Sequence, residues 1–134
     1  MSKLAFLPFA LLALASCGGN SGTDGDYQML VQQAAAEEAV ASSLAPASPC
    51  SQASQCGVLT FQHTSGHCVQ ASYKVYSLLS STATTAEADA REQVQLANRA
   101  VAAAPPPQEA CVQSIVLPPS VLCVANTCEA SPVQ

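Results

Sequence analysis

The apolar positions of the chain fall into separated stretches, and the longest of them opens the sequence. It runs from Leu4 to Leu14 behind a single cation, Lys3, and is broken only by Pro8. About a dozen apolar residues are too few to cross a hydrocarbon core, which takes roughly 20. One cation, a short apolar run and small residues after it are typical of a cleaved signal peptide, here residues 1–16.

A first helix is predicted from Asp26 to Leu44, where apolar residues are spaced among alanines and glutamines. The Asp26 carboxylate can accept hydrogen bonds from the first free backbone amides of such a helix. Its apolar face is narrow, so packing of this helix against the rest is not assured. Gly, Ser and Asn dominate residues 17–25, and we expect a flexible tether there.

Helical spacing is clearest from about Thr85 to Ala104. The run Thr84 to Glu87 has the S/T-x-x-E form, in which hydroxyl and carboxylate satisfy free amides at a helix start. Glu87 and Arg91 form an (i, i+4) pair, and Pro105-Pro106-Pro107 ends the helix. Its predicted apolar face is Ala90, Val94, Ala97 and Val101.

Alternating or β-branched stretches predict short strands. Val58 to Gln62 alternates, whereas Tyr73 to Leu79 fits both strand and helix spacing. Cys111 to Leu117 and Ser120 to Val124 flank Pro118-Pro119 and also suggest strands.

These stretches together predict a small α+β domain at residues 49–134, in which one long helix packs on a few short antiparallel strands. Residues 26–48 precede it as a helix or linker.

Removing residues 1–16 changes the composition. The whole chain is 49% hydrophobic, but the remainder is rich in alanine. Its aromatic residues are Tyr27, Phe61, Tyr73 and Tyr76. Without Lys3 the formal net charge goes from −5 to −6, which argues against binding to nucleic acid or to an anionic bilayer by charge.

Leu14-Ala15-Ser16-Cys17 resembles the lipobox of bacterial lipoproteins at every position. In that family the cysteine sulfur carries a diacylglyceryl group, and the chain is cut before the cysteine. The resemblance implies a lipid anchor on Cys17, which would hold the mature chain to a membrane without spanning it. Gly18, where aspartate would favour inner-membrane retention, implies an outer-membrane lipoprotein facing the periplasm.

Lipidation of Cys17 leaves six cysteines, an even set that predicts three disulfides in an oxidising compartment. Six cysteines allow 15 connectivities. The segments between them hold 5, 11, 42, 11 and 4 residues, nearly a mirror image. This spacing suggests the nested pairs Cys50-Cys128, Cys56-Cys123 and Cys68-Cys111.

Few residues suggest chemistry. His63 and His67 would share one face of a helix as zinc ligands, but Thr64-Ser65-Gly66 between them is typical of a loop, and a third ligand is missing. Ser65 lies in no nucleophile motif, and the carboxylates near Arg91 are expected to be solvated. We therefore assign no metal, no cofactor and no enzymatic activity.

Three functions remain open. The first is an envelope module that binds a protein partner or the cell wall. A second is a protease inhibitor, because Val116-Leu117-Pro118-Pro119-Ser120 between Cys111 and Cys123 faintly resembles the Pro-Pro loops of disulfide-rich inhibitors. The third is a metal-binding or hydrolytic role for His63 and His67.

The run from Pro49-Cys50 through Gln55-Cys56 to Cys123 and Cys128 is similar to cysteine-rich lipoproteins of Gram-negative bacteria. That resemblance supplies no activity and supports only an anchored module.

Overall fold

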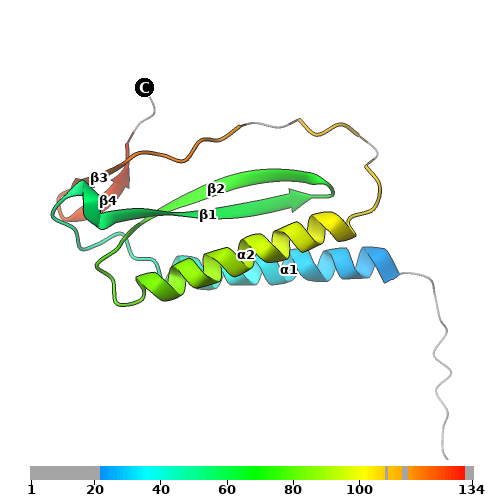
Figure 1. Cartoon of the computed structure of the whole chain (residues 1–134), viewed down its shortest axis with the longest axis horizontal. Helices are drawn as coiled ribbons and strands as arrows, with labels where there is room; N and C mark the ends of the chain where they lie inside the picture. Colours follow the sequence, from blue (N-terminus) through cyan, green and yellow to red (C-terminus); the bar gives the residue numbers. More distant parts are fainter. Residues whose placement is uncertain (1–21, 108, 113–114, 132–134) are drawn as a thin grey trace, which may run out of the picture.

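The computed structural model describes residues 22–107, 109–112 and 115–131, which form two long helices and two β-hairpins (Figure 1). The helices lie side by side under the longer hairpin, and the shorter hairpin sits at one end of it. The elements in chain order are α1 (Gly22–Ser43), η1 (Ala53–Gln55), β1 (Cys56–Ser65), β2 (Cys68–Ser77), α2 (Ala83–Ala103), β3 (Val121–Val124) and β4 (Thr127–Ala130). The structure confirms a small, disulfide-stapled α+β domain with a long helix, and the helix expected before it is formed as a second long helix that packs in the same fold.

The hairpin of β1 and β2 is the backbone of the fold. The strands pair antiparallel over ten residues each, from Cys56 opposite Ser77 to Ser65 opposite Cys68. The two-residue turn between them begins at Gly66, whose φ of 61° is easy for glycine. The stretch from Tyr73 that fitted two periods is therefore strand, because pairing with β1 selects the alternating pattern.

One face of this hairpin carries the core. Leu59, Phe61 and Tyr76 are buried on it. They pack with Leu44 against small residues of the two helices and the loop after α1, namely Ala41, Ala45, Ala83, Ala86 and Ala90. Gly57 lies beside Tyr76, and a Cβ at Gly57 would approach Tyr76 Cε1 to 2.7 Å. Alanine faces let the helices come close, while the hairpin supplies the bulky side chains.

Helix α1 differs from the expected helix in its start and in its packing. It begins at Gly22, a turn before Asp26, so residues 22–25 are helical and Asp26 does not cap. It packs along α2 through Ala34 and Ala41, which are buried, although large apolar residues such as Met29 stay exposed. No described helix is both long and apolar enough to span a membrane.

Helix α2 covers almost the predicted residues but starts differently. Its N-cap is Thr82, whose hydroxyl donates to the Leu44 carbonyl at 2.6 Å instead of capping the helix. Thr84 lies inside the helix, and Glu87 accepts a hydrogen bond from the Tyr76 hydroxyl, so the predicted capping box does not form. A tertiary contact has taken the carboxylate that the local motif needed.

The buried face of α2 also differs from the predicted one. Ala90 and Ala97 are buried as expected, but Val94 is only half-buried and Gln93 is 1% exposed. The Gln62 N–H donates to Gln93 Oε1 at 3.0 Å, and Gln93 Nε2 donates back to the Gln62 carbonyl at 2.6 Å. Gln93 therefore serves the edge of β1 as a neighbouring strand would.

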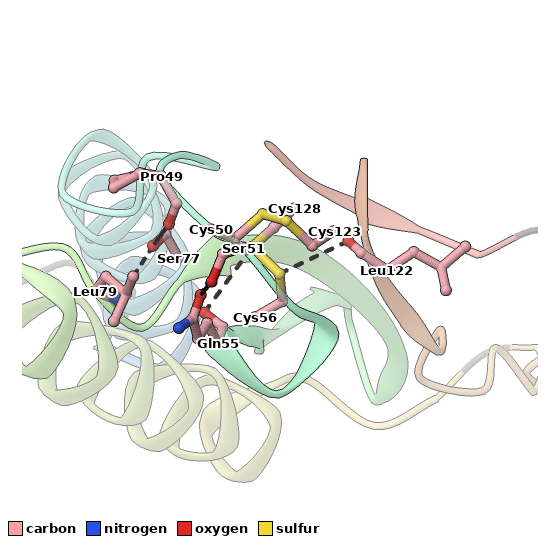
Figure 2. Close-up of a disulfide and its surroundings, with 10 residues drawn as sticks. All are labelled: Pro49, Cys50, Ser51, Gln55, Cys56, Ser77, Leu79, Leu122, Cys123 and Cys128. Carbon is pink, nitrogen blue, oxygen red and sulfur yellow. Dashed lines mark hydrogen bonds between the residues drawn. A yellow bond between two sulfur atoms is a disulfide. The ribbon is translucent and has the colours of Figure 1, made fainter. Parts of the chain in front are cut away.

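Three disulfides join the hairpin and the loop before it to the C-terminal part of the chain. Cys68–Cys111 is the pair that the spacing suggested. The other two are Cys50–Cys123 and Cys56–Cys128, so the expected Cys50-Cys128 and Cys56-Cys123 pairs are wrong (Figure 2).

The register of the shorter hairpin explains this exchange. Cys123 and Cys128 face each other across β3 and β4, so either could reach Cys50. The path of the segment before η1 determines which cysteine Cys50 bonds, because the Cys50 N–H donates to the Asn126 carbonyl in the turn between β3 and β4. Neither this hairpin nor the direction of the incoming chain can be deduced from cysteine spacing.

Candidate functional site

The candidate site is the described part of the segment that connects α2 to β3, residues 109–112 and 115–120, which we call the strap. It has no helix or strand, so the strand predicted from Cys111 to Leu117 is wrong for its described residues. In Figure 1 the segment follows the β-hairpin on the side of β2, opposite the helices. The three prolines after α2 stop the helix and turn the chain into this course.

The strap is tied to the fold at several points. Cys68–Cys111 fixes its beginning to β2, and Cys50–Cys123 fixes the strand that follows it. Between them the Tyr73 hydroxyl donates to the Val116 carbonyl at 2.9 Å. At its end the Ser131 N–H donates to the Ser120 carbonyl at 2.7 Å. These ties limit the conformations of a segment that has no ladder of its own.

The strap exposes large apolar side chains. Val112 is 89% exposed, Ile115 87% and Leu117 70%, and Val116 is about half exposed. Such exposure is notable in a chain whose core is built mainly from alanine. A run of apolar side chains displayed together on a restrained segment is typical of a surface that binds something.

The segment predicted as an inhibitor loop is the C-terminal half of this strap. Leu117 and Pro118 point away from the buried core, as their exposure shows, while Pro119 is half-buried. The stretch is tied between two disulfides as the sequence suggested, although its anchors lie on different elements.

The two histidines do not form the expected pair on a helix. His63 lies on β1, and His67 lies in the turn between the strands, next to the prolines that follow α2. Among the described residues, the group of three or more metal-ligating side chains is Cys50, Cys56 and Cys128, and all three sulfurs are in disulfides. Among the described residues, neither histidine therefore belongs to a group of three ligating side chains.

His63 instead joins two residues that the sequence did not single out. Its Nδ1 lies 3.5 Å from Glu38 Oε2 of α1, and its Nε2 lies 2.7 Å from Ser72 Oγ of β2. Ser72 could have been found from the hairpin turn, since that turn fixes which β2 residues lie next to His63. Glu38 could not, because its place depends on how α1 packs.

A separate groove lies between β1 and α2, with a volume of about 540 Å³. Val58, Thr60 and Val94 line it, and Tyr76 and Glu87 meet at its wall. Burial, and then the hydrogen bond to Glu87, raises the pKa of Tyr76 above its usual range. The Tyr76 hydroxyl stays protonated and donates to Glu87, so we interpret it as a structural group of the core.

The carboxylates of α2 near Arg91, which were expected to be solvated, are partly exposed and lie near arginines. Glu87 is 4.0 Å from Arg91, the predicted (i, i+4) pair, and Arg99 bonds Glu92 at 3.4 Å on the same helix. Both pairs are exposed enough that solvent screens them.

Cys17 lies outside the described residues, so the structure says nothing of the lipid anchor. No family model matches the chain, and no curated protein or solved structure is significantly similar to it.

Proposed function

We propose that this protein is a lipid-anchored envelope protein that binds a partner protein through the strap. The observation that carries the proposal is the exposure of Val112, Ile115 and Leu117 on a segment that disulfides hold at both ends. Apolar side chains on a preorganised segment bind with a smaller loss of conformational entropy than the same residues on a free loop.

A protein fits the strap better than the bilayer interior does. The strap has no helix or strand, so most of its backbone N–H and C=O groups lack partners in a regular ladder. Such groups are costly in hydrocarbon, where nothing can bond to them. A partner protein can cover the apolar side chains and also bond the backbone groups.

The lipid on Cys17 would keep the domain close to the membrane. Because α1 begins at Gly22, five residue-to-residue steps separate the anchor at Cys17 from the folded part. Fully extended, they reach at most about 18 Å. The partner is therefore expected at or near the same membrane, which we propose is the outer membrane on its periplasmic side.

A photo-crosslinking amino acid at position 117 tests this proposal in the cells that make the protein. The expected result is a discrete adduct with one protein, identified by mass spectrometry. A matched probe at Thr84, exposed on α2, should not give that adduct. Adducts that are the same from both positions, or lipid adducts alone from position 117, would contradict a strap-bound protein partner.

A protease inhibitor is the narrower form of this proposal. It is supported by exposed Leu117 directly before Pro118 on a segment tied at both ends. If the crosslinked partner is a protease, the purified protein should slow its hydrolysis of a peptide substrate, and Leu117→Asp should remove the inhibition. Uninhibited hydrolysis at a saturating concentration would leave only a binding role.

A further inference from the structure

The strongest unassigned arrangement in the molecule is the contact of Glu38, His63 and Ser72. His63 lies on β1 and Ser72 on β2, on the same face of the hairpin, one diagonal step apart in the register. Glu38 reaches this face from α1. Three elements thus bring a carboxylate, an imidazole and a hydroxyl together outside the strap.

The atoms are in the order that nucleophilic catalysis uses. Glu38 faces Nδ1 and Ser72 faces Nε2, the two opposite nitrogens of His63. With the ring proton on Nδ1 toward the carboxylate, Nε2 is free to accept the Ser72 hydroxyl proton at 2.7 Å. The 3.5 Å between Glu38 and Nδ1 is long for a hydrogen bond, and catalytic contacts of this kind commonly tighten when substrate binds.

A small cavity lies beside His63 on the same part of the hairpin. Its volume is about 130 Å³, and its lining includes His63, Ser65, Cys68 and Gln70. Ser72 is not part of that lining and adjoins it through its contact with His63. That volume holds about four waters, or one short acyl group. Gln70 is directly opposite His63 in the register, and its amide offers N–H donors for an acyl oxygen.

We propose that Ser72, His63 and Glu38 hydrolyse esters of short carboxylic acids. Ser72 Oγ attacks the acyl carbon while its proton passes to His63 Nε2. The bond to the alcohol breaks, and the leaving alcohol takes that proton. Water then attacks the acyl group on Ser72, gives a proton to His63, and releases the carboxylic acid as Ser72 recovers its own. Glu38 orients the ring and stabilises its charged form.

This activity goes beyond binding through the strap and does not depend on it. The His63 side chain is 49% exposed and the Glu38 side chain 27%. Solvent therefore weakens the electrostatic interaction between the Glu38 carboxylate and the His63 ring more than in a buried triad. We therefore expect slow turnover, with small acyl groups favoured because the cavity beside His63 is small.

Two measurements on the full chain, purified in detergent, test the proposal. A fluorophosphonate should label Ser72, because Oγ displaces fluoride and forms a bond to phosphorus. Hydrolysis of 4-nitrophenyl acetate should fall about a hundredfold in Ser72→Ala and in His63→Gln, the range of one general base. Glu38→Gln should lower kcat more than it changes KM, as a positioning residue would.

Matched controls separate this site from the ester hydrolysis that any imidazole gives. His67→Gln removes the other histidine and should keep the rate, and Ser81→Ala, on an exposed serine, should keep both rate and label. Circular dichroism of each variant confirms the fold. Labelling of a serine other than Ser72, no label at all, or hydrolysis that survives Ser72→Ala would overturn the proposal.

Discussion

Replacing Gln93 with methionine tests how the helices hold the hairpin. Gln93 is 1% exposed and bonds both backbone groups of Gln62, at 3.0 and 2.6 Å. Methionine is unbranched and of similar volume, so Gln93→Met removes the two hydrogen bonds without opening a large cavity. The backbone N–H and C=O of Gln62 then lose their partners, because β2 pairs with the other side of β1.

The size of the effect follows from those two groups. An unmade hydrogen bond at a buried backbone group costs about 1–3 kcal/mol. Gln62 is only half-buried, so water can reach these groups in part and the lower half of that range applies. We expect the free energy of unfolding to fall by about 2–4 kcal/mol, a large share of the stability of a small domain.

Urea denaturation followed by circular dichroism measures this loss, with disulfides intact and the slope against urea unchanged. Gln95→Met is the matched control, since Gln95 is exposed on the same helix and should change the free energy by less than about 0.5 kcal/mol. A Gln93→Met variant as stable as Gln95→Met would refute the idea that this side chain completes the edge of β1.

Three further changes test other parts of the structure. Gly57→Ala should lower the free energy of unfolding by about 1–3 kcal/mol in the same assay, because the added Cβ meets the Tyr76 ring. Gly25→Ala is the control: it has open space around it in α1 and should be neutral or stabilise the protein by up to about 1 kcal/mol. Equal effects of the two changes would contradict the close contact at Gly57. Unfolded tyrosine loses its proton near pH 10, whereas the raised pKa of folded Tyr76 keeps its proton on. The free energy of unfolding that Tyr76 contributes is therefore constant below pH 10 and should fall above it by up to about 1.4 kcal/mol per pH unit. Urea titrations from pH 8 to 11 should show this slope and its loss in Tyr76→Phe, and the same slope in both proteins would contradict the raised pKa. Removing Cys68–Cys111 with two serines should lower the free energy of unfolding by up to about 4 kcal/mol and speed proteolysis of the strap; an unchanged strap would show that the bond does not restrain it.

The sequence predicted elements whose pattern is local. Helix α2 is long, alanine-rich and ended by three prolines, and all three features are visible in one window. The buried face of α2 could not be predicted in full from that window, because Gln93 is buried through a contact with Gln62 of β1, 31 residues away in the sequence. Periodicity finds apolar stripes and cannot see a polar side chain that is buried to satisfy a distant backbone.

Strand β4 and the strap show the opposite limits. The turn before β4 uses Ala125 and Asn126, both at positive φ, and alanine gives no signal of such a turn. In the strap, β-branched residues predicted a strand, but the described residues there have none. Residues with strand propensity form a strand only when a neighbouring strand edge pairs with them. The described part of the strap is held by disulfides and has no such pairing.

The candidate sites divide in the same way. Cysteine count predicted three disulfides, and the turn at Gly66 would have placed Ser72 next to His63. The exposure of Leu117 and the approach of Glu38 follow from packing of segments far apart in sequence, which a single sequence does not encode in any local pattern.

Mapping the disulfides of the native protein tests most directly whether the strap is a binding segment that disulfides hold at both ends, to β2 through Cys111 and to the loop before β1 through Cys123. Trypsin leaves Cys50, Cys56 and Cys68 on one fragment and the other three cysteines on another, so peptic cleavage at acid pH must separate them. Linked peptides for Cys68–Cys111 and Cys50–Cys123 are the expected result. A bond between Cys111 and Cys123, or a free thiol at Cys111, would leave the strap unattached to β2 and would contradict it.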